Sequence, residues 1–223
     1  MNKKILAIIP ARGGSKSIPR KNIKDLAGKP MIAYIIQTVK SVHEIDRVIV
    51  STEDEEIAMV AKKWGAEVPF FRPEWLANDE VPTLPVLQYT LEELKNKEGY
   101  IPDYVLLVYP TSPLLRFERI QEAIKLALEN DADSVVSGTL VKGHYWQKIG
   151  GRYQRLYPVA VENRQLTEPL FKENGAIYLN KTSVLSSSIV GEKMLPLLME
   201  EGENVDVDEI SDFQHVEKII ESR

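Results

Sequence analysis

Five short runs of apolar and β-branched residues alternate with stretches of helical pattern along most of the chain. These runs predict strands at 3–10, 46–52, 103–110, 133–139 and 174–180. Because they are apolar on both faces, both faces must be covered, as in a parallel sheet between helices. We therefore expect an α/β fold with three layers, a mainly parallel sheet with helices on both faces, and ligands at the carboxyl ends of the strands.

The intervals between these runs carry helical periodicity. Thr52 followed by Glu55 has the pattern of a capping box, which predicts a helix over 53–65 that stops at Gly65. The other predicted helices cover 31–42 and 82–97, and a fourth has one apolar face made of Ile120, Ala123, Ile124, Ala127 and Leu128.

Length and composition restrict the number of domains and the partners. A chain of 223 residues has room for one domain, 1–223, with a small insertion. With no cysteine and three histidines, any metal must be a hard cation on carboxylates. The net charge of −5 disfavours a nucleic-acid surface, and no segment approaches the roughly 18 apolar residues of a membrane span. We expect a cytoplasmic protein that binds neither nucleic acid nor membrane.

Residues 139–173 interrupt the alternation of strands and helices. Gly150 and Gly151 stand there between two short alternating runs, which is the sequence pattern of a β-hairpin. We therefore place a small hairpin excursion within the single domain, and "excursion" below means this segment.

The first predicted strand leads into a loop rich in glycine and positive charge. Gly13 and Gly14 allow close approach to a ligand, so backbone N–H groups of the loop can point at phosphate oxygens. The loop matches neither the Walker pattern nor the dinucleotide pattern GxGxxG, and a surface turn with solvated lysines is the alternative. Its cations are Arg12, Lys16, Arg20, Lys21 and, just beyond, Lys24.

A pair of carboxylates near the C-terminus is the second chemical element. In the stretch VDVD at 205–208, Asp206 and Asp208 alternate with valines, so in a strand both would share one face about 7 Å apart. Oxygen ligands at that spacing suit Mg²⁺, which takes its remaining ligands from water and phosphate. The alternative is a solvated acidic edge.

The segment IIPARGGSKSIPRKNIKDLAGKPMIAY resembles the N-terminal signature of the acylneuraminate cytidylyltransferases, the CMP-sialic acid or CMP-nonulosonate synthetase family. The similarity continues in the family's order through DRVIVSTEDEEIAMVAKKWGAEVPFFRP, LANDEVPT, PTSPLLR, NGAIYLN and VDVDEISDF. The first motif differs from the loop of the CMP-Kdo synthetases and from the GxGTRL-type loop of the sugar 1-phosphate nucleotidyltransferases.

The resemblance implies a nucleotide-diphospho-sugar transferase-like fold and Mg²⁺-dependent transfer of CMP from CTP to the anomeric hydroxyl of a nine-carbon 2-keto acid sugar, with release of pyrophosphate. Catalytic charge stabilisation on the triphosphate would come from Arg12, Lys16 and Lys21, and the metal would bind Asp206 and Asp208. The implied contacts of the nucleotide, with cytosine read by Arg72 and the segment 79–83, are Ala11, Arg12, Gly13, Ser15, Asn22, Arg72, Val81 and Thr83.

The resemblance places part of the sugar recognition in the excursion, which in the family docks on a second subunit, so a homodimer is implied. The matching sugar-binding positions are Lys148, Arg164, Lys172 and Tyr178. Tyr109 replaces a glutamine that faces the sugar in the family, and Ile189 with Val190 replaces a frequent aromatic pair. These departures argue against N-acetylneuraminate as the preferred substrate and leave legionaminate, pseudaminate, KDN or a related nonulosonate open, with Tyr109 as a sugar-binding residue.

Two other functions remain open at this point. A sugar 1-phosphate nucleotidyltransferase on the same fold would use another nucleoside triphosphate and a phosphorylated sugar. A non-catalytic regulatory module would bind a nucleotide without turning it over. The pair Asp206 and Asp208 argues against the module, since binding alone does not need two metal-binding carboxylates.

Overall fold

The computed structural model describes residues 3–157, 163, 168–200, 202–203 and 205–222. Its centre is a six-stranded sheet in the order β10-β6-β9-β5-β1-β4, in which only β9 runs against the others. The sheet is therefore mainly parallel, as predicted. Its strands are β1 (Ile5–Pro10), β4 (Arg47–Ser51), β5 (Tyr104–Leu107), β6 (Ser134–Val141), β9 (Leu170–Lys181) and β10 (Met194–Leu198).

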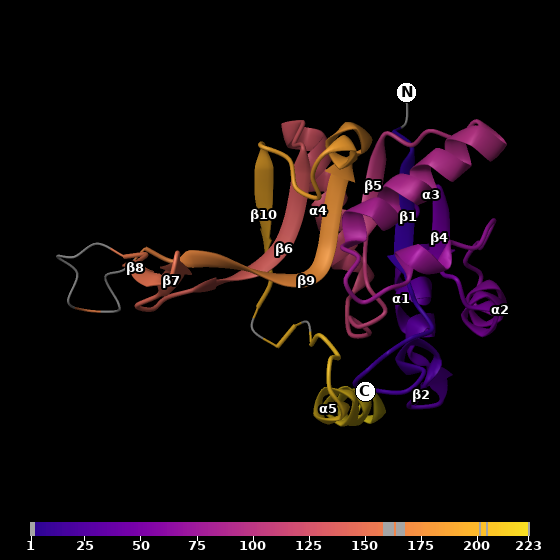
Figure 1. Ribbon diagram of the computed structural model, residues 1–223, viewed down its shortest axis with the longest axis horizontal. Helices are drawn as coiled ribbons and strands as arrows, with labels where there is room; N and C mark the ends of the chain where they lie inside the picture. Colours follow the sequence, from indigo (N-terminus) through magenta and orange to yellow (C-terminus); the bar gives the residue numbers. More distant parts are fainter. Residues whose placement is uncertain (1–2, 158–162, 164–167, 201, 204, 223) are drawn as a thin grey trace.

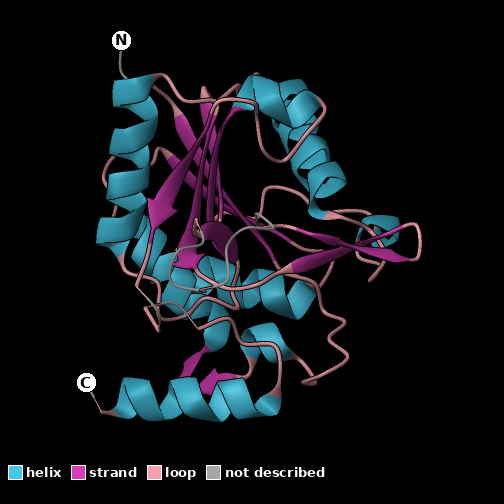
Figure 2. Cartoon of the chain, turned by 90° about the vertical axis from the view of Figure 1, so that its left-hand side faces the viewer, coloured by secondary structure: helices cyan, strands magenta, loops and turns pink. Residues whose placement is uncertain are grey.

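Helices cover both faces of this sheet (Figure 2). The side chains of β1 alternate between the faces: Ala7 and Ile9 pack with α1 (Met31–Lys40), α2 and α4, whereas Leu6 and Ile8 pack with α3. Both sets are fully buried, which is why the strand is apolar throughout. The three other helices here are α2 (Glu55–Lys63), α3 (Thr83–Glu98) and α4 (Phe117–Asn130). No described helix is long and apolar enough to cross a membrane.

Two local predictions about these helices are wrong. The residue that caps α2 is Asp54, whose carboxylate accepts the N–H of Ile57 at 2.9 Å, while the hydroxyl of Thr52 accepts the N–H of Asp54 at 3.1 Å. A carboxylate two residues nearer the helix reaches the free N–H groups of the first turn better than the threonine. Leu128 is 43% exposed and lies off the buried face of α4.

The acidic segment at 205–208 is not a strand, in contrast to the prediction. Val207 is fully buried, and its N–H donates to the carbonyl of Thr111 at 2.8 Å. An unpredicted helix follows, α5 (Ile210–Glu221), which begins with a capping box between Glu209 and Asp212. Figure 1 shows α5 beside the small ribbon of β2 (Asp25–Leu26) and β3 (Lys29–Pro30).

The excursion projects from one side of the sheet (Figure 1). It contains the hairpin of β7 (Trp146–Ile149) and β8 (Arg152–Arg155), paired antiparallel. Gly150 and Gly151 join the two strands with φ of 55° and 81°, the backbone that a two-residue hairpin turn requires. The predicted hairpin is confirmed. Three short 3₁₀ helices complete the described elements: η1 (Lys21–Ile23), η2 (Glu74–Leu76) and η4 (Thr182–Ser186).

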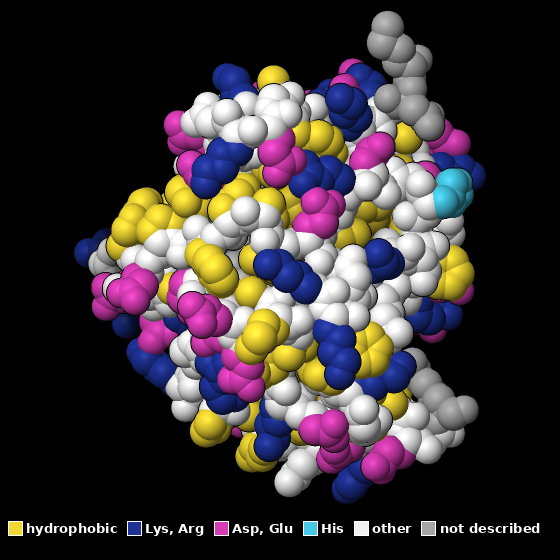
Figure 3. Space-filling model, turned by 90° about the vertical axis from the view of Figure 1, so that its right-hand side faces the viewer, with side chains coloured by type: hydrophobic (Ala, Val, Ile, Leu, Met, Phe, Trp, Pro, Cys, Tyr) yellow, Lys and Arg dark blue, Asp and Glu magenta, His cyan; other side chains and the backbone are white. Residues whose placement is uncertain are grey.

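The face turned away from the excursion mixes charges of both signs. Lysine and arginine side chains are interspersed there with acidic and apolar ones (Figure 3). The positive charge of the loop after β1 is thus a local feature and not part of a wider basic surface on that face.

Candidate active site

A cavity of about 420 Å³ lies where β1 and β5 end, the edge of the sheet at which ligands are expected. Its walls come from the loop after β1, the segment before α3, the loop after β5 and the acidic segment near the C-terminus. Ten of the predicted site residues line it: Arg12, Ser15, Lys16, Lys21, Asn22, Arg72, Val81, Thr83, Tyr109 and Asp208.

Two cations of the loop converge on one carboxylate. Arg12 forms an ion pair with Asp79, and the Lys16 ammonium lies 2.6 Å from the same side chain. The hydrogen bond from Lys16 and the nearby Arg12 hold the pKa of Asp79 below its usual value. Asp79 was expected only as the first residue of the cytosine-reading segment 79–83, and its pairing with these two cations was not predicted. It occupies the position that an anionic ligand of these two cations would take.

The peptide between Arg12 and Gly13 is fixed on both sides. Its carbonyl accepts from the Asn22 amide at 2.9 Å, and its N–H donates to Glu53 at 2.7 Å. The N–H of Gly13 is therefore not available to a phosphate, which corrects the expectation for this residue. Ala11 is buried, its N–H bonds the Ser51 carbonyl, and it does not line the cavity.

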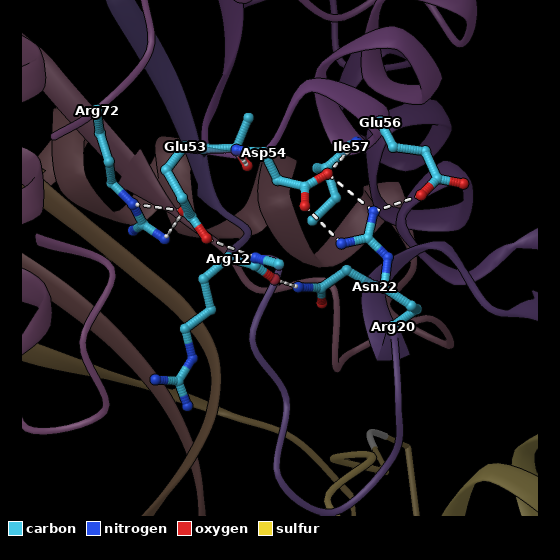
Figure 4. Close-up of polar contacts among 10 residues, drawn as sticks. Arg12, Arg20, Asn22, Glu53, Asp54, Glu56, Ile57 and Arg72 are labelled. Atoms are coloured by element: carbon cyan, nitrogen blue, oxygen red, sulfur yellow. Dashed lines mark hydrogen bonds and ion pairs between the residues drawn. The ribbon is translucent and has the colours of Figure 1, made fainter. Parts of the chain in front are cut away.

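Arg20 serves the fold and not the cavity. It adopts a left-handed φ of 57°, and its guanidinium bonds the Asp54 carboxylate at 2.5 and 2.8 Å and that of Glu56 at 2.6 Å. This pairing lowers the pKa of Asp54 to about 2. One cation of the motif thus ties the loop to the start of α2 (Figure 4).

Lys21 connects the basic loop with the acidic segment. Its side chain is 12% exposed, its ammonium donates to the carbonyl of Val207 at 2.8 Å, and the Asp208 carboxylate lies 3.6 Å away. Partial burial raises the pKa of Asp206, and the charge of Asp208 adds to this effect. The fold therefore brings together two predicted elements that are separated by most of the sequence.

Arg72 is buried against Glu53. Its side chain is 4% exposed, and its Nε and Nη2 donate to one carboxylate oxygen of Glu53 at 3.3 and 2.9 Å. Arg72 also lines the cavity. Its guanidinium points at the Glu53 carboxylate (Figure 4). Glu53 was missed at the sequence level, although the acidic run TEDEE follows the strand neighbouring the basic loop.

The predicted sugar-binding residues lie largely outside this cavity. Tyr109 lines it, with its hydroxyl 2.9 Å from that of Thr83. Tyr178 donates to Glu173 at 2.8 Å, and Lys172 lines a separate cavity of about 530 Å³. Lys148 lies exposed on β7, and Arg164 falls outside the described residues. Among the described sugar positions, Tyr109 therefore shares the cavity with the nucleotide positions, whereas Lys148, Lys172 and Tyr178 do not line it.

The sequence matches the model of the family described as cytidylyltransferase over residues 6–215. The chain belongs to the cytidylyltransferase family. It is 33% identical to the CMP-N,N′-diacetyllegionaminic acid synthase of Legionella pneumophila over 98% of this chain and 97% of that protein. It is 41% identical to a pseudaminic acid cytidylyltransferase of Campylobacter jejuni over 61% of this chain and 58% of that protein. N-acylneuraminate cytidylyltransferase A of Danio rerio is 33% identical over 93% of this chain and 48% of that protein.

These relatives place this cytidylyltransferase in the CMP-nonulosonate synthetase family, so the resemblance of its motifs is confirmed. The enzyme is a cytidylyltransferase of the nonulosonate type. All three relatives are named for nonulosonic acids, which favours this function over a sugar 1-phosphate nucleotidyltransferase and over a non-catalytic module.

Two solved structures show the fold of this cytidylyltransferase. A CMP:2-keto-3-deoxy-manno-octonic acid synthetase in complex with CTP has a TM-score of 0.72 at 17% identity, covering 98% of this chain and 99% of that one. A 4-diphosphocytidyl-2C-methyl-D-erythritol synthase of Anaerococcus prevotii has a TM-score of 0.70 at 15% identity, covering 99% and 100%. The predicted nucleotide-diphospho-sugar transferase-like fold is confirmed.

Proposed function

We propose that this cytidylyltransferase transfers CMP from CTP to the anomeric hydroxyl of a nonulosonic acid other than N-acetylneuraminate, uses Mg²⁺, and acts as a homodimer. The contact between Lys21 and the acidic segment supports the proposal, because Lys21 bonds the Val207 carbonyl beside Asp206, and Lys21 and Asp208 both line the cavity. In the reaction the sugar hydroxyl oxygen bonds to the α-phosphorus, the bond to the bridging oxygen breaks, and pyrophosphate leaves.

Arg12 and Lys16 are proposed to bind the phosphates that leave. Fixed cations stabilise charge that develops on a leaving pyrophosphate, which is a main source of catalysis in phosphoryl transfer. In this structure both cations rest on Asp79, so CTP would replace a carboxylate with a more highly charged group. Lys21 is far less exposed than Lys16 and is proposed to contact the transferred phosphate.

Asp206 and Asp208 are proposed to hold the Mg²⁺. Mg²⁺ commonly binds proteins through one or two carboxylates and completes its shell with water and substrate phosphates. The described residues contain no cluster of three or more histidine or acidic side chains for a metal, so a two-carboxylate site is the donor set that remains. When bound, the ion would supply Lewis-acid polarisation of the α-phosphate.

The homodimer is supported by the surface of the excursion. Seven of its large apolar side chains are exposed in the single chain, and on one folded ribbon such a set indicates contact with another protein surface. A second copy would cover them and bring Lys148 towards the partner's cavity. These residues are Leu140, Tyr145, Trp146, Ile149, Tyr153, Leu156 and Leu170.

Tyr109 supports a sugar with apolar substituents. Its hydroxyl is engaged with Thr83, so the group that it brings to the cavity is mainly the ring. A ring edge accepts methyl groups, whereas an amide both donates and accepts hydrogen bonds. Deoxy or diacylamino nonulosonates such as legionaminate present more methyl groups than N-acetylneuraminate does.

The reaction is tested by measuring pyrophosphate release with each of four nucleoside triphosphates and a panel of nonulosonic acids. We expect turnover with CTP, Mg²⁺ and a deoxy or diacylamino nonulosonate. Preference for another nucleotide with a phosphorylated sugar would contradict the proposal.

The role of Tyr109 is tested by comparing kcat/KM for legionaminate and N-acetylneuraminate in the wild type and in Tyr109→Gln. We expect the wild type to prefer legionaminate and the variant to lose about tenfold of that preference. Tyr89→Gln is the control, because this tyrosine lies on α3 outside the cavity wall. A wild type that prefers N-acetylneuraminate tenfold, with a ratio unchanged by the substitution, would exclude Tyr109 as the selector.

A further inference from the structure

We infer that Glu53 is a positioning residue that sets the preference of the enzyme for cytosine by fixing Arg72 relative to the phosphate loop. The inference rests on the proposed function in one respect, namely that Arg72 faces the base of CTP. Glu53 does not line the cavity, so it would act through the two groups that it holds.

Glu53 divides its two carboxylate oxygens between two segments of the chain. Oε1 accepts the N–H of Gly13 at 2.7 Å, in the loop after β1. Oε2 accepts from Nε and Nη2 of Arg72 at 3.3 and 2.9 Å. Figure 4 shows Glu53 between Arg72 and the loop that carries Arg12. One side chain, 17% exposed, therefore links the base end and the phosphate end of the cavity.

Arg72 has little freedom to move. Its N–H donates to the carbonyl of Thr52 at 3.0 Å, and its side chain is 4% exposed. The bonds to Glu53 use Nε and one hydrogen of Nη2, so Nη1 and the second hydrogen of Nη2 are the donors that Arg72 has besides them. A planar guanidinium held through two of its nitrogens keeps the third in a fixed direction.

The loop is equally constrained at its contact with Glu53. The N–H of Gly13 and the carbonyl of Arg12 belong to one peptide, and Asn22 holds that carbonyl at 2.9 Å. A Cβ at Gly13 would collide with the Asp54 carboxylate, so a residue with a side chain would push this peptide away from Glu53. The Arg12 side chain leaves the same peptide in the opposite direction from Glu53 (Figure 4).

A fixed donor distinguishes cytosine from uracil. The N3 atom of cytosine is a hydrogen-bond acceptor, whereas N3 of uracil carries a proton and is a donor. If uracil binds beside a buried guanidinium that cannot turn away, the N–H of the guanidinium and the N3–H of uracil face each other, and neither has an acceptor. Such unpaired polar groups give strong discrimination between ligands. If the guanidinium can shift, the enzyme loses this discrimination between cytosine and uracil, while its binding of the phosphates is less affected.

Glu53→Gln tests the link. The glutamine amide has one acceptor oxygen and one NH₂ group, so it can accept from Gly13 or from Arg72 but not from both. We measure the dissociation constants of CTP and UTP by calorimetry without sugar. The preference for CTP, given as the UTP constant divided by the CTP constant, should fall at least about tenfold in the variant. The control is Glu67→Gln, since Glu67 holds Arg47 through two nitrogens at 2.5 and 3.1 Å and does not line the cavity. Its CTP preference should equal that of the wild type.

The outcomes separate this inference from the proposed function. A wild type without a preference for CTP would contradict the proposed function itself. A wild type that prefers CTP, together with a folded Glu53→Gln that keeps the full preference or weakens CTP and UTP equally, would overturn the role of Glu53. If Glu53→Gln fails to fold cooperatively in thermal unfolding, Glu53→Asp replaces it. This side chain keeps the charge but is one methylene too short to hold both partners, and the same loss of preference is expected.

Discussion

The nucleotide side of the cavity and the excursion differ in how completely one chain builds them. On the nucleotide side, Lys21 and Arg72 are nearly buried, and each bonds groups of its own chain. On the excursion, β7 and β8 are exposed along almost their whole length. The nucleotide side is thus preformed in the single chain, whereas the excursion leaves its strands uncovered, as the proposed homodimer requires.

The difference follows from where each half is attached. The loops of the nucleotide side leave strands that are packed on both faces, so the core fixes their starting points. The excursion carries a two-stranded ribbon, and such a ribbon is marginally stable in water unless another surface covers it. The predictions below test this contrast, from the largest expected effect to the smallest.

The largest effect is expected from the two carboxylates that are proposed to hold Mg²⁺. Asp206→Asn and Asp208→Asn should each abolish pyrophosphate release with Mg²⁺ and recover part of it with Mn²⁺, which accepts neutral ligands more readily. EDTA should abolish pyrophosphate release by the wild type. Asp131→Asn is the control, because Asp131 pairs with Lys181 away from the cavity and its left-handed backbone tolerates asparagine. Full activity of the chelated wild type would remove the metal from the mechanism.

The next largest effect is expected from the cations of the preformed half. Arg12→Ala and Lys21→Ala should each raise the barrier to turnover by about 2 to 4 kcal/mol while thermal unfolding stays cooperative. Lys40→Ala is the matched control, since Lys40 also donates to a backbone carbonyl, that of Gly65 at 2.9 Å, but outside the cavity. Near-normal kcat in both loop variants would show that the cavity is not where the triphosphate reacts.

An intermediate effect is expected from the excursion. Trp146→Glu, at a residue that is 49% exposed, should shift the protein to monomers in analytical ultracentrifugation. The KM for the sugar should rise about tenfold, and the Kd for CTP should stay within about twofold, because the nucleotide half is complete in one chain. Ile101→Glu, at a residue that is 57% exposed on the main body, should change neither the KM for the sugar nor the Kd for CTP. If sugar binding and CTP binding weakened equally, the nucleotide side and the excursion would not differ in their need for a second chain.

The preformed half was also the part most accessible from sequence. Its strands are apolar on both faces and its loop carries a long motif, so the sheet edge and ten of the lining residues could be predicted. The partners of these residues could not, because Asp79 and Glu53 are carboxylates in acidic runs whose solvated members have the same local pattern. Only the folded chain shows which carboxylates meet Arg12 and Arg72.

The segment 205–208 shows a second limit of sequence patterns. Alternating valine and aspartate is typical of a strand, yet Val207 is buried beneath the loop after β5 and packs in a cluster with Phe213 of α5. An alternating pattern of apolar and acidic residues can thus arise because tertiary packing buries one valine, without a neighbouring strand. The strand β10 has a proline at its centre and only one buried side chain, and it was missed because proline and partial exposure weaken the strand signal.

The smallest effect concerns the anchor of the acidic segment. Glu203 lies between β10 and Asp206, and its carboxylate bonds Arg119 at 2.5 and 2.7 Å and Arg116 at 2.7 Å, both at the start of α4. These bonds lower the pKa of Glu203 from an ordinary value of 4.5 to about 2. The anchor therefore stabilises the fold fully above pH 4.5 and loses this contribution as the pH falls towards 2.

Glu203→Gln should lower the free energy of unfolding by about 2 kcal/mol at pH 7. This value is smaller than the full pKa shift of Glu203 would give, because Arg116 is half exposed and solvent screens its contact with Glu203. The difference from the wild type, measured by urea unfolding, should shrink below pH 4.5, where the wild-type carboxylate loses its advantage over the unfolded chain. Glu129→Gln on the same helix is the control, because its contact with Lys125 is 3.9 Å long and exposed. A difference that stays constant down to pH 2 would show that Glu203 acts through packing and not through its charge.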